Sequence, residues 1–150
     1  MSAAKPPTEE QKREWFARSL IRFDESPMHR AIGLEMLGMS WGEVELRLTC
    51  PPDFRNAHGT IHGGLLMTSL DSAVLQSVRS NVVGHFGQST IELKANFMRP
   101  AVNASVRVFG TALHVGRTTG VARAVAVDDE GRTIAAALGT IHIAPRAEAT

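Results

Sequence analysis

Residues 56–71 read NAHGTIHGGLLMTSLD and combine a polar turn, two adjacent glycines and an apolar helical segment that carries one carboxylate. Gly63 and Gly64 are poorly suited to a helix interior, but they let a helix begin where a ligand approaches the backbone closely. Asp71 follows about two turns later and is the only Asp, Glu, Lys or Arg in the stretch. A lone carboxylate among apolar side chains is costly to bury. The stretch therefore predicts a buried helix that keeps Asp71 for catalysis.

Alternating apolar and polar residues predict β-strands on both sides of this helix, which we expect over residues 64–80. Two strands precede the helix and four follow it, and DDEG at residues 128–131 is typical of a hairpin connection. The expected strands cover residues 34–39, 43–48, 91–97, 104–115, 121–127 and 132–143.

Two further helices are predicted near the N-terminus. Thr8 and Gln11 fit a capping box at the start of a helix that runs to about Phe23. Ser26, followed by proline, suits the start of a second, short helix, and Gly33 suits its end.

This order of elements indicates an α+β domain with a mainly antiparallel sheet. The simplest assembly is a curled sheet of about five or six strands wrapped around one central helix. An open sheet leaves an edge, which a second copy of the chain would cover. We divide the chain into an N-terminal tail and outer helix (1–27), a main domain (28–144) and a C-terminal tail (145–150). Alanines on the last two strands predict a helix lying close against them: Ala122, Ala124, Ala126, Ala135, Ala136 and Ala137.

Length and composition exclude several classes of protein. A chain of 150 residues fits one domain, and a net charge of +1 without a basic run gives no reason to expect a nucleic-acid partner. No apolar stretch approaches the length of a membrane span or a signal peptide, so we expect a cytoplasmic protein without a membrane partner. The single cysteine, Cys50, rules out an internal disulfide and is expected to be a small packed residue rather than a nucleophile.

Asn56, the HGG motif at residues 62–64, Asp71 and Ser89, with Arg99-Pro100 further on, give a pattern that resembles the hotdog-fold acyl-CoA thioesterases of the phenylacetate-degradation type. The resemblance covers the main domain. It implies the hotdog fold and hydrolysis of an aryl- or fatty-acyl-CoA. Coenzyme A is then part of the substrate, and no separate cofactor is expected.

Gly63 and Asp71 would carry the chemistry of such a reaction. Thioester hydrolysis requires a polarised carbonyl and a base or nucleophile. Gly63 offers a backbone N–H at a helix N-terminus, where the helix dipole favours negative charge, and the matching glycine of the resembled family binds the thioester oxygen. Asp71 would act as general base on water or attack the carbonyl itself; the sequence leaves both open.

Three other side chains would support this pair. Ser89 is in phase with the apolar residues of its strand, so we expect it to point inward, either onto Asp71 or as a small packed residue. Asn56 either donates its amide to the substrate or shapes a turn. His62 is expected to orient groups or to contact the thiol end of the substrate, rather than to act as the base.

Gly64, Arg99 and Arg117 are the expected substrate-binding residues. A glycine lets a thioester lie against the backbone, and arginines following strand ends could hold the phosphates of coenzyme A. No metal is expected, because His58 and His62 lack a clear third ligand.

The resemblance also implies a homo-oligomer with sites between subunits. Asn56, His62 and Gly63 of one subunit would meet Asp71 and Ser89 of the other, so activity would require a dimer, with a tetramer of two dimers expected.

Other functions remain open at this point. A non-catalytic acyl-CoA-binding protein or sensor would need the pocket but not Asp71. A hotdog hydratase or dehydratase would show a different arrangement of histidine and acid. A structural or interaction module would not explain the acid in an apolar helix.

Overall fold

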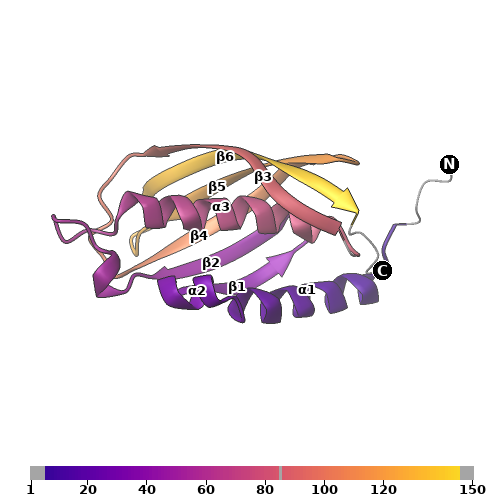
Figure 1. Cartoon of the computed structure of the whole chain (residues 1–150), viewed down its shortest axis with the longest axis horizontal. Helices are drawn as coiled ribbons and strands as arrows, with labels where there is room; N and C mark the ends of the chain where they lie inside the picture. The colour runs from indigo at the N-terminus through magenta and orange to yellow at the C-terminus, as the bar shows by residue number, and fades with distance from the viewer. Residues whose placement is uncertain (1–5, 85, 146–150) are drawn as a thin grey trace.

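The computed structural model describes residues 6–84 and 86–145. Within them lie three α-helices, one short 3-10 helix and six strands (Figure 1). The predicted C-terminal tail, residues 145–150, begins one residue too early, because Pro145 still belongs to β6; residues 146–150 and the first five residues of the predicted N-terminal tail lie outside the described residues. The elements in chain order are α1 (Glu9–Asp24), α2 (Pro27–Ile32), β1 (Leu34–Ser40), β2 (Glu43–Thr49), η1 (Pro52–Phe54), α3 (Gly63–Ser80), β3 (Phe86–Phe97), β4 (Ser105–Val115), β5 (Thr119–Val127) and β6 (Thr133–Pro145).

All six strands form one sheet in the order β1-β2-β4-β5-β6-β3, and every neighbouring pair is antiparallel. Figure 1 shows the sheet curving around α3, with β3 and β6 on one side of the helix and β1 on the other. The outer helix α1 runs beside β1. This confirms the predicted α+β architecture of a curled antiparallel sheet around one central helix.

The two N-terminal helices begin and end where their capping residues predict. The Thr8 hydroxyl accepts a hydrogen bond from the Gln11 N–H, and the Gln11 side chain accepts one from the Thr8 N–H. Ser26 caps α2, and Gly33 ends it with φ of 70°. A Cβ on Gly33 would run into the Thr49 carbonyl, so glycine is needed there for space as well as for its backbone conformation.

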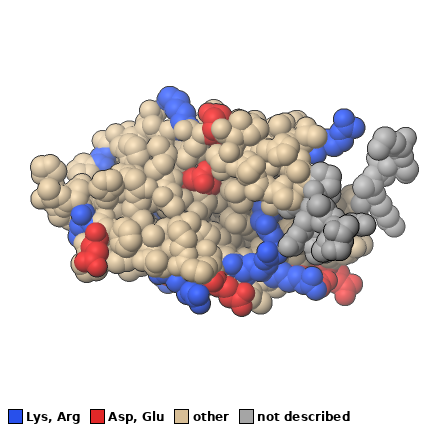
Figure 2. Space-filling model, viewed as in Figure 1, with Lys and Arg blue, Asp and Glu red and all other residues tan. Residues whose placement is uncertain are grey.

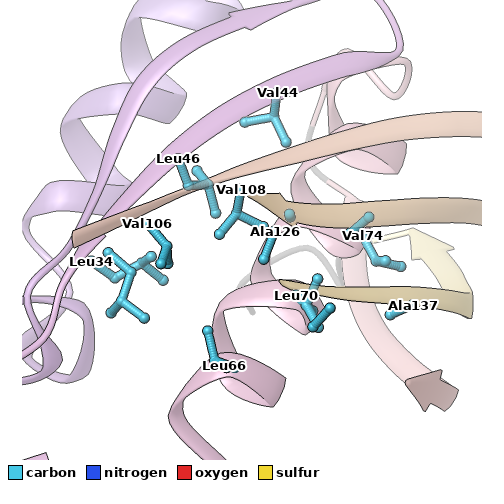
Figure 3. Close-up of a cluster of buried hydrophobic side chains, with 14 of the residues drawn as sticks. Leu34, Val44, Leu46, Leu66, Leu70, Val74, Val106, Val108, Ala126 and Ala137 are labelled. Carbon is cyan, nitrogen blue, oxygen red and sulfur yellow. The ribbon is translucent and has the colours of Figure 1, made fainter. Parts of the chain in front are cut away.

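The core lies between the sheet and one side of α3. Leu66, Leu70 and Val74 of α3 pack with buried side chains of β1, β2, β4, β5 and β6 (Figure 3). A Cβ on Gly110 of β4 would collide with the Ala73 carbonyl oxygen, so the helix and this strand are in backbone contact. The alanines of β5 and β6 that were predicted to lie against the helix are buried in the same core, with one exception. Ala136 faces the outer side of the sheet, as strand alternation requires.

The predicted burial of α3 is only partial in the protomer. The sheet covers only one side of the helix, and a stripe of residues facing away from it is half-buried or exposed in the protomer. Residues spaced three or four apart share one helix face, which explains the membership of this outward stripe. It consists of Gly64, Thr68, Asp71, Leu75 and Arg79.

Strand β3 contains a register shift that the sequence did not reveal. Its pairing with β6 jumps from Thr90 opposite Ile141 to Glu92 opposite Thr140, so Ile91 is an extra residue. Such a bulge reverses which residues of a strand point inward. Ser89 and Ile91 are consequently exposed, and the prediction that Ser89 points toward the helix was wrong.

Candidate functional site

The N-terminus of α3 is capped by a histidine side chain. The Nδ1 atom of His62 accepts a hydrogen bond of 2.9 Å from the Gly64 N–H. Nδ1 is therefore the acceptor nitrogen of this ring, an arrangement that in a neutral imidazole leaves the proton on Nε2. A Cβ on Gly64 would lie 3.0 Å from Nδ1. Glycine at this position therefore makes room for the imidazole that caps the helix.

At position 63, in contrast, neither the backbone conformation nor the packing of the chain requires a glycine. Its φ is not positive, and an added Cβ would come no closer than 3.9 Å to the Phe97 ring. Within the part of the chain that the structure describes, the Gly63 N–H has no acceptor. Unpaired N–H groups at a helix start attract negative charge. Gly63 thus presents a donor without an acceptor among the described residues, and the Phe97 ring is the nearest group to the place that a side chain would take.

Asn56 organises the loop that leads into α3. Its Oδ1 accepts from the N–H groups of His58 and Thr60 at 2.9 and 3.2 Å, and its Nδ2 donates to the Thr60 hydroxyl at 2.8 Å. The Gly59 N–H donates to the Asn56 carbonyl at 2.9 Å. Of the two roles considered for Asn56, the structure shows the turn-shaping one. One hydrogen on Nδ2 is left over for another acceptor.

Asp71 lies on the outward stripe of α3 and is held by β3. The Thr90 hydroxyl donates a hydrogen bond of 2.8 Å to Asp71 Oδ1. Thr90 therefore takes the place that alternation assigned to Ser89, because the bulge at Ile91 turns Thr90 inward. No sequence signal marked this bulge. Ser89 is exposed and lies opposite His142 of β6.

Arg79 does not neutralise Asp71. Its Nη1 donates to Gln88 Oε1 at 3.1 Å, and its guanidinium lies 5.0 Å from the centre of the Trp15 ring. Burial lowers the pKa of Arg79, with a smaller contribution from Arg22. Among the described residues Asp71 has no ion-pair partner, so its carboxylate is not explained as half of a salt bridge.

One protomer does not bring the two halves of the expected site together. Eight residues separate Gly63 from Asp71, which corresponds to about 12 Å along a helix at 1.5 Å per residue. A thioester carbonyl bound at Gly63 would be out of reach of the Asp71 carboxylate of the same chain. Asn56, His62 and Gly63 cluster at the helix start, whereas Asp71 and Thr90 meet near its middle.

The two candidate phosphate-binding arginines lie at opposite ends of α3. Arg99 follows β3 at the end where Phe97 approaches Gly63, and its Nη1 donates to the Thr133 carbonyl at 2.7 Å. Arg117 lies beside the C-terminal end of the helix, in a cleft that Asn81 also lines. The Arg99 and Arg117 of one chain therefore do not share a binding site.

Other reactive groups are not arranged for catalysis. The Cys50 thiol is buried and donates to the Pro51 carbonyl at 3.3 Å, and burial raises its pKa. A thiol in that state is a poor nucleophile. No cluster of three or more His, Cys, Asp or Glu residues suited to a metal ion occurs within residues 6–84 and 86–145.

Over the same described residues, no helix has both the length and the apolar character needed to span a membrane.

The face of the molecule over α3 is largely uncharged. Figure 2 shows this face mostly in tan, with scattered acidic and basic side chains, and a denser group of charged side chains along the lower edge.

Comparisons with known proteins place this geometry in a family. The model of the thioesterase superfamily matches residues 58–135, which contain the helix start, Asp71 and Thr90. The acyl-coenzyme A thioesterase PaaI of Escherichia coli is 26% identical over 115 residues, covering 75% of this chain and 79% of that protein.

Solved structures agree with this match. A thioesterase family protein from Silicibacter pomeroyi superposes with a TM-score of 0.77 at 28% identity, covering 91% of this chain and 97% of that one. The E. coli PaaI structure superposes with a TM-score of 0.78 at 20% identity, covering 91% and 95%, and shows a likeness of fold. The chain therefore belongs to the thioesterase superfamily, and it is a thioester hydrolase with the hotdog fold.

Proposed function

We propose that this protein hydrolyses an aryl- or fatty-acyl-CoA to the free acid and coenzyme A. Two observations together carry the proposal. Among the described residues the Gly63 N–H has no acceptor, and Asp71, which Thr90 holds, has no cation paired with it. The chain's similarity to a protein described as an acyl-coenzyme A thioesterase supports coenzyme A as the thiol. Coenzyme A arrives with the substrate, and the reaction needs no separate cofactor.

In the proposed reaction the Gly63 N–H donates to the thioester oxygen and stabilises the negative charge that develops there. Asp71 either takes a proton from the attacking water or attacks the carbonyl carbon itself to form an anhydride that water then hydrolyses. In both cases the bond from carbon to sulfur breaks, and the thiolate of coenzyme A leaves.

The working unit of this proposal is a dimer. Gly63 and Asp71 of one chain are about 12 Å apart along the helix, so each site must combine the Gly63 end of one subunit with the Asp71 of the other. Strand β3 is at the end of the strand order, and pairing two copies at that edge about a two-fold axis would set their α3 helices antiparallel. We expect a dimer for activity and a tetramer of two dimers.

The substitution Asp71→Asn tests the role of the carboxylate. It keeps the size of the side chain and removes the base or nucleophile, so we expect kcat to fall by about 10² or more with an unchanged melting temperature. Thiol release from a panel of aryl-, short- and long-acyl-CoAs gives the measurement. Glu92→Gln, an exposed acid on the same strand as Thr90, is the matched control. A near-normal kcat in Asp71→Asn would refute the assignment.

A mixing experiment tests the shared site. Gly63→Pro removes the N–H donor at the first helical position, where proline is well tolerated. Unfolding and refolding a 1:1 mixture of Gly63→Pro and Asp71→Asn chains should restore about a quarter of the wild-type activity, because half of the dimers then hold one intact site. If both variants are inactive alone and the refolded mixture is inactive too, the sites are not shared between subunits.

A further inference from the structure

A cleft of about 390 Å³ opens beside the N-terminus of α3. One wall belongs to α3 and its cap, with His62, Leu65 and Thr68. The opposite wall is formed by Met28 and Ile32 of α2 and by Phe54 of η1. Because His62 and Gly64, which also lines the cleft, are the chain neighbours of Gly63, the cleft adjoins the proposed carbonyl-binding N–H.

The chemistry of this α2 cleft suits a hydrocarbon group. Four of the lining residues, Met28, Ile32, Phe54 and Leu65, are apolar, and the one hydroxyl on the α3 wall, that of Thr68, already donates to the Gly64 carbonyl at 3.0 Å. Asp53 and Arg55 also line the cleft, and the Arg55 guanidinium donates to the Gly59 carbonyl. The pantetheine arm of coenzyme A carries two amides, which lose free energy when they are buried without partners. An apolar acyl group loses none, and it gains from leaving water.

Two other clefts of comparable size do not adjoin the helix start. A cleft of about 430 Å³ lies over β1, β2 and β4, where Glu43 and Glu45 contribute to its lining. Another, of about 490 Å³, lies at the C-terminal end of α3 beside Arg117. Neither cleft is lined by a residue next to Gly63, so neither is placed to hold the group attached to a carbonyl at that N–H.

We infer that the α2 cleft receives the acyl group of the substrate and that Met28 and Phe54 set the length it accepts; this inference rests on the proposed function. At about 30 Å³ for each water-sized unit, 390 Å³ holds roughly a dozen non-hydrogen atoms. Medium-chain and arylacyl groups fit this volume, whereas a palmitoyl group exceeds it. The wall formed by Met28, Ile32 and Phe54 lies outside the residues that match the family model, 58–135.

The test is a change of acyl-length preference in the full-length protein. Met28 is 47% exposed at the rim, so Met28→Trp should fill the cleft without disturbing the core. Ala31→Trp, an exposed position of the same helix outside the lining, is the matched control. Phe54→Ala should lengthen the cleft. We would measure kcat/KM for butyryl-, octanoyl-, dodecanoyl-, palmitoyl- and phenylacetyl-CoA, with circular dichroism and melting temperatures for each variant.

Each methylene of the acyl chain that is buried on binding should raise kcat/KM about fourfold. Met28→Trp should therefore lower kcat/KM for octanoyl- and dodecanoyl-CoA by roughly tenfold to a hundredfold while leaving butyryl-CoA within about threefold. Phe54→Ala should raise the relative activity on palmitoyl-CoA, and Ala31→Trp should keep the wild-type profile. A folded, active Met28→Trp with an unchanged profile would overturn this inference and leave the proposed function standing. A wild-type protein inactive on every acyl-CoA would overturn both.

Discussion

Replacing Thr90 by valine removes one hydrogen bond and little else. Threonine and valine have nearly the same shape, and the Thr90 hydroxyl donates to Asp71 Oδ1 at 2.8 Å. Without this bond the Asp71 side chain keeps its charge but loses the contact that orients it relative to α3. The substitution therefore separates the presence of the carboxylate from its position.

The size of the effect follows from the type of bond. Hydrogen bonds to charged groups contribute about 1.5–3 kcal/mol, and about 1.4 kcal/mol corresponds to a factor of ten in rate. If the orientation of Asp71 is needed in the transition state, kcat should fall by roughly tenfold to a hundredfold. Because Asp71 is only half-buried, water can replace the lost hydrogen-bond partner in the resting protein. The free energy of unfolding should therefore change by less than about 1.5 kcal/mol.

The assay is steady-state thiol release for Thr90→Val and for the control Ser89→Ala, with urea unfolding of both. Thr90→Ser, which restores a hydroxyl, should recover most of the lost kcat. Ser89→Ala should stay within about twofold of wild type, because Ser89 lies on the opposite face of β3 from Thr90, away from Asp71. Equal losses in Ser89→Ala and Thr90→Val, or a normal kcat in Thr90→Val, would refute the positioning role of Thr90.

Two further predictions concern glycines. Gly63→Pro deletes the N–H and should lower kcat by about 10²–10³, the range for removing an oxyanion donor. Gly63→Ala keeps the N–H, so its kcat should fall by less. Equal kcat values for the two variants would disprove the role of this N–H. Gly110→Ala forces a Cβ against the Ala73 carbonyl and should lower the free energy of unfolding by about 1–3 kcal/mol. Gly38→Ala, where the added Cβ meets nothing within 4 Å, is its urea-unfolding control, and equal midpoints would contradict the close helix–strand contact.

The secondary structure could be predicted because its signals are local. Thr8 with Gln11 caps α1, Ser26 and Gly33 bound α2, and each of these contacts spans a few residues. Strand alternation similarly reports which side chains of a strand share a face. These short-range rules, together with the strand order along the chain, were sufficient for an antiparallel sheet around one helix.

The prediction about Ser89 was wrong because alternation holds only while a strand keeps its register. The extra residue Ile91 is decided by how β3 pairs with β6, a contact about 50 residues away in sequence. Nothing in the local residue pattern shows where such a bulge falls. Thr90, the residue that holds Asp71, could therefore be found only from the tertiary structure.

By itself, the sequence determined the elements, their caps, the antiparallel sheet and the stretch of residues 56–71 that begins the central helix. Only the tertiary structure decided which side of that helix the sheet covers and which hydroxyl meets Asp71. The physical reason is the separation in sequence of the residues that interact. Capping and alternation depend on residues close together in the chain, whereas burial and register depend on strands that are far apart in the chain and are brought together by the fold.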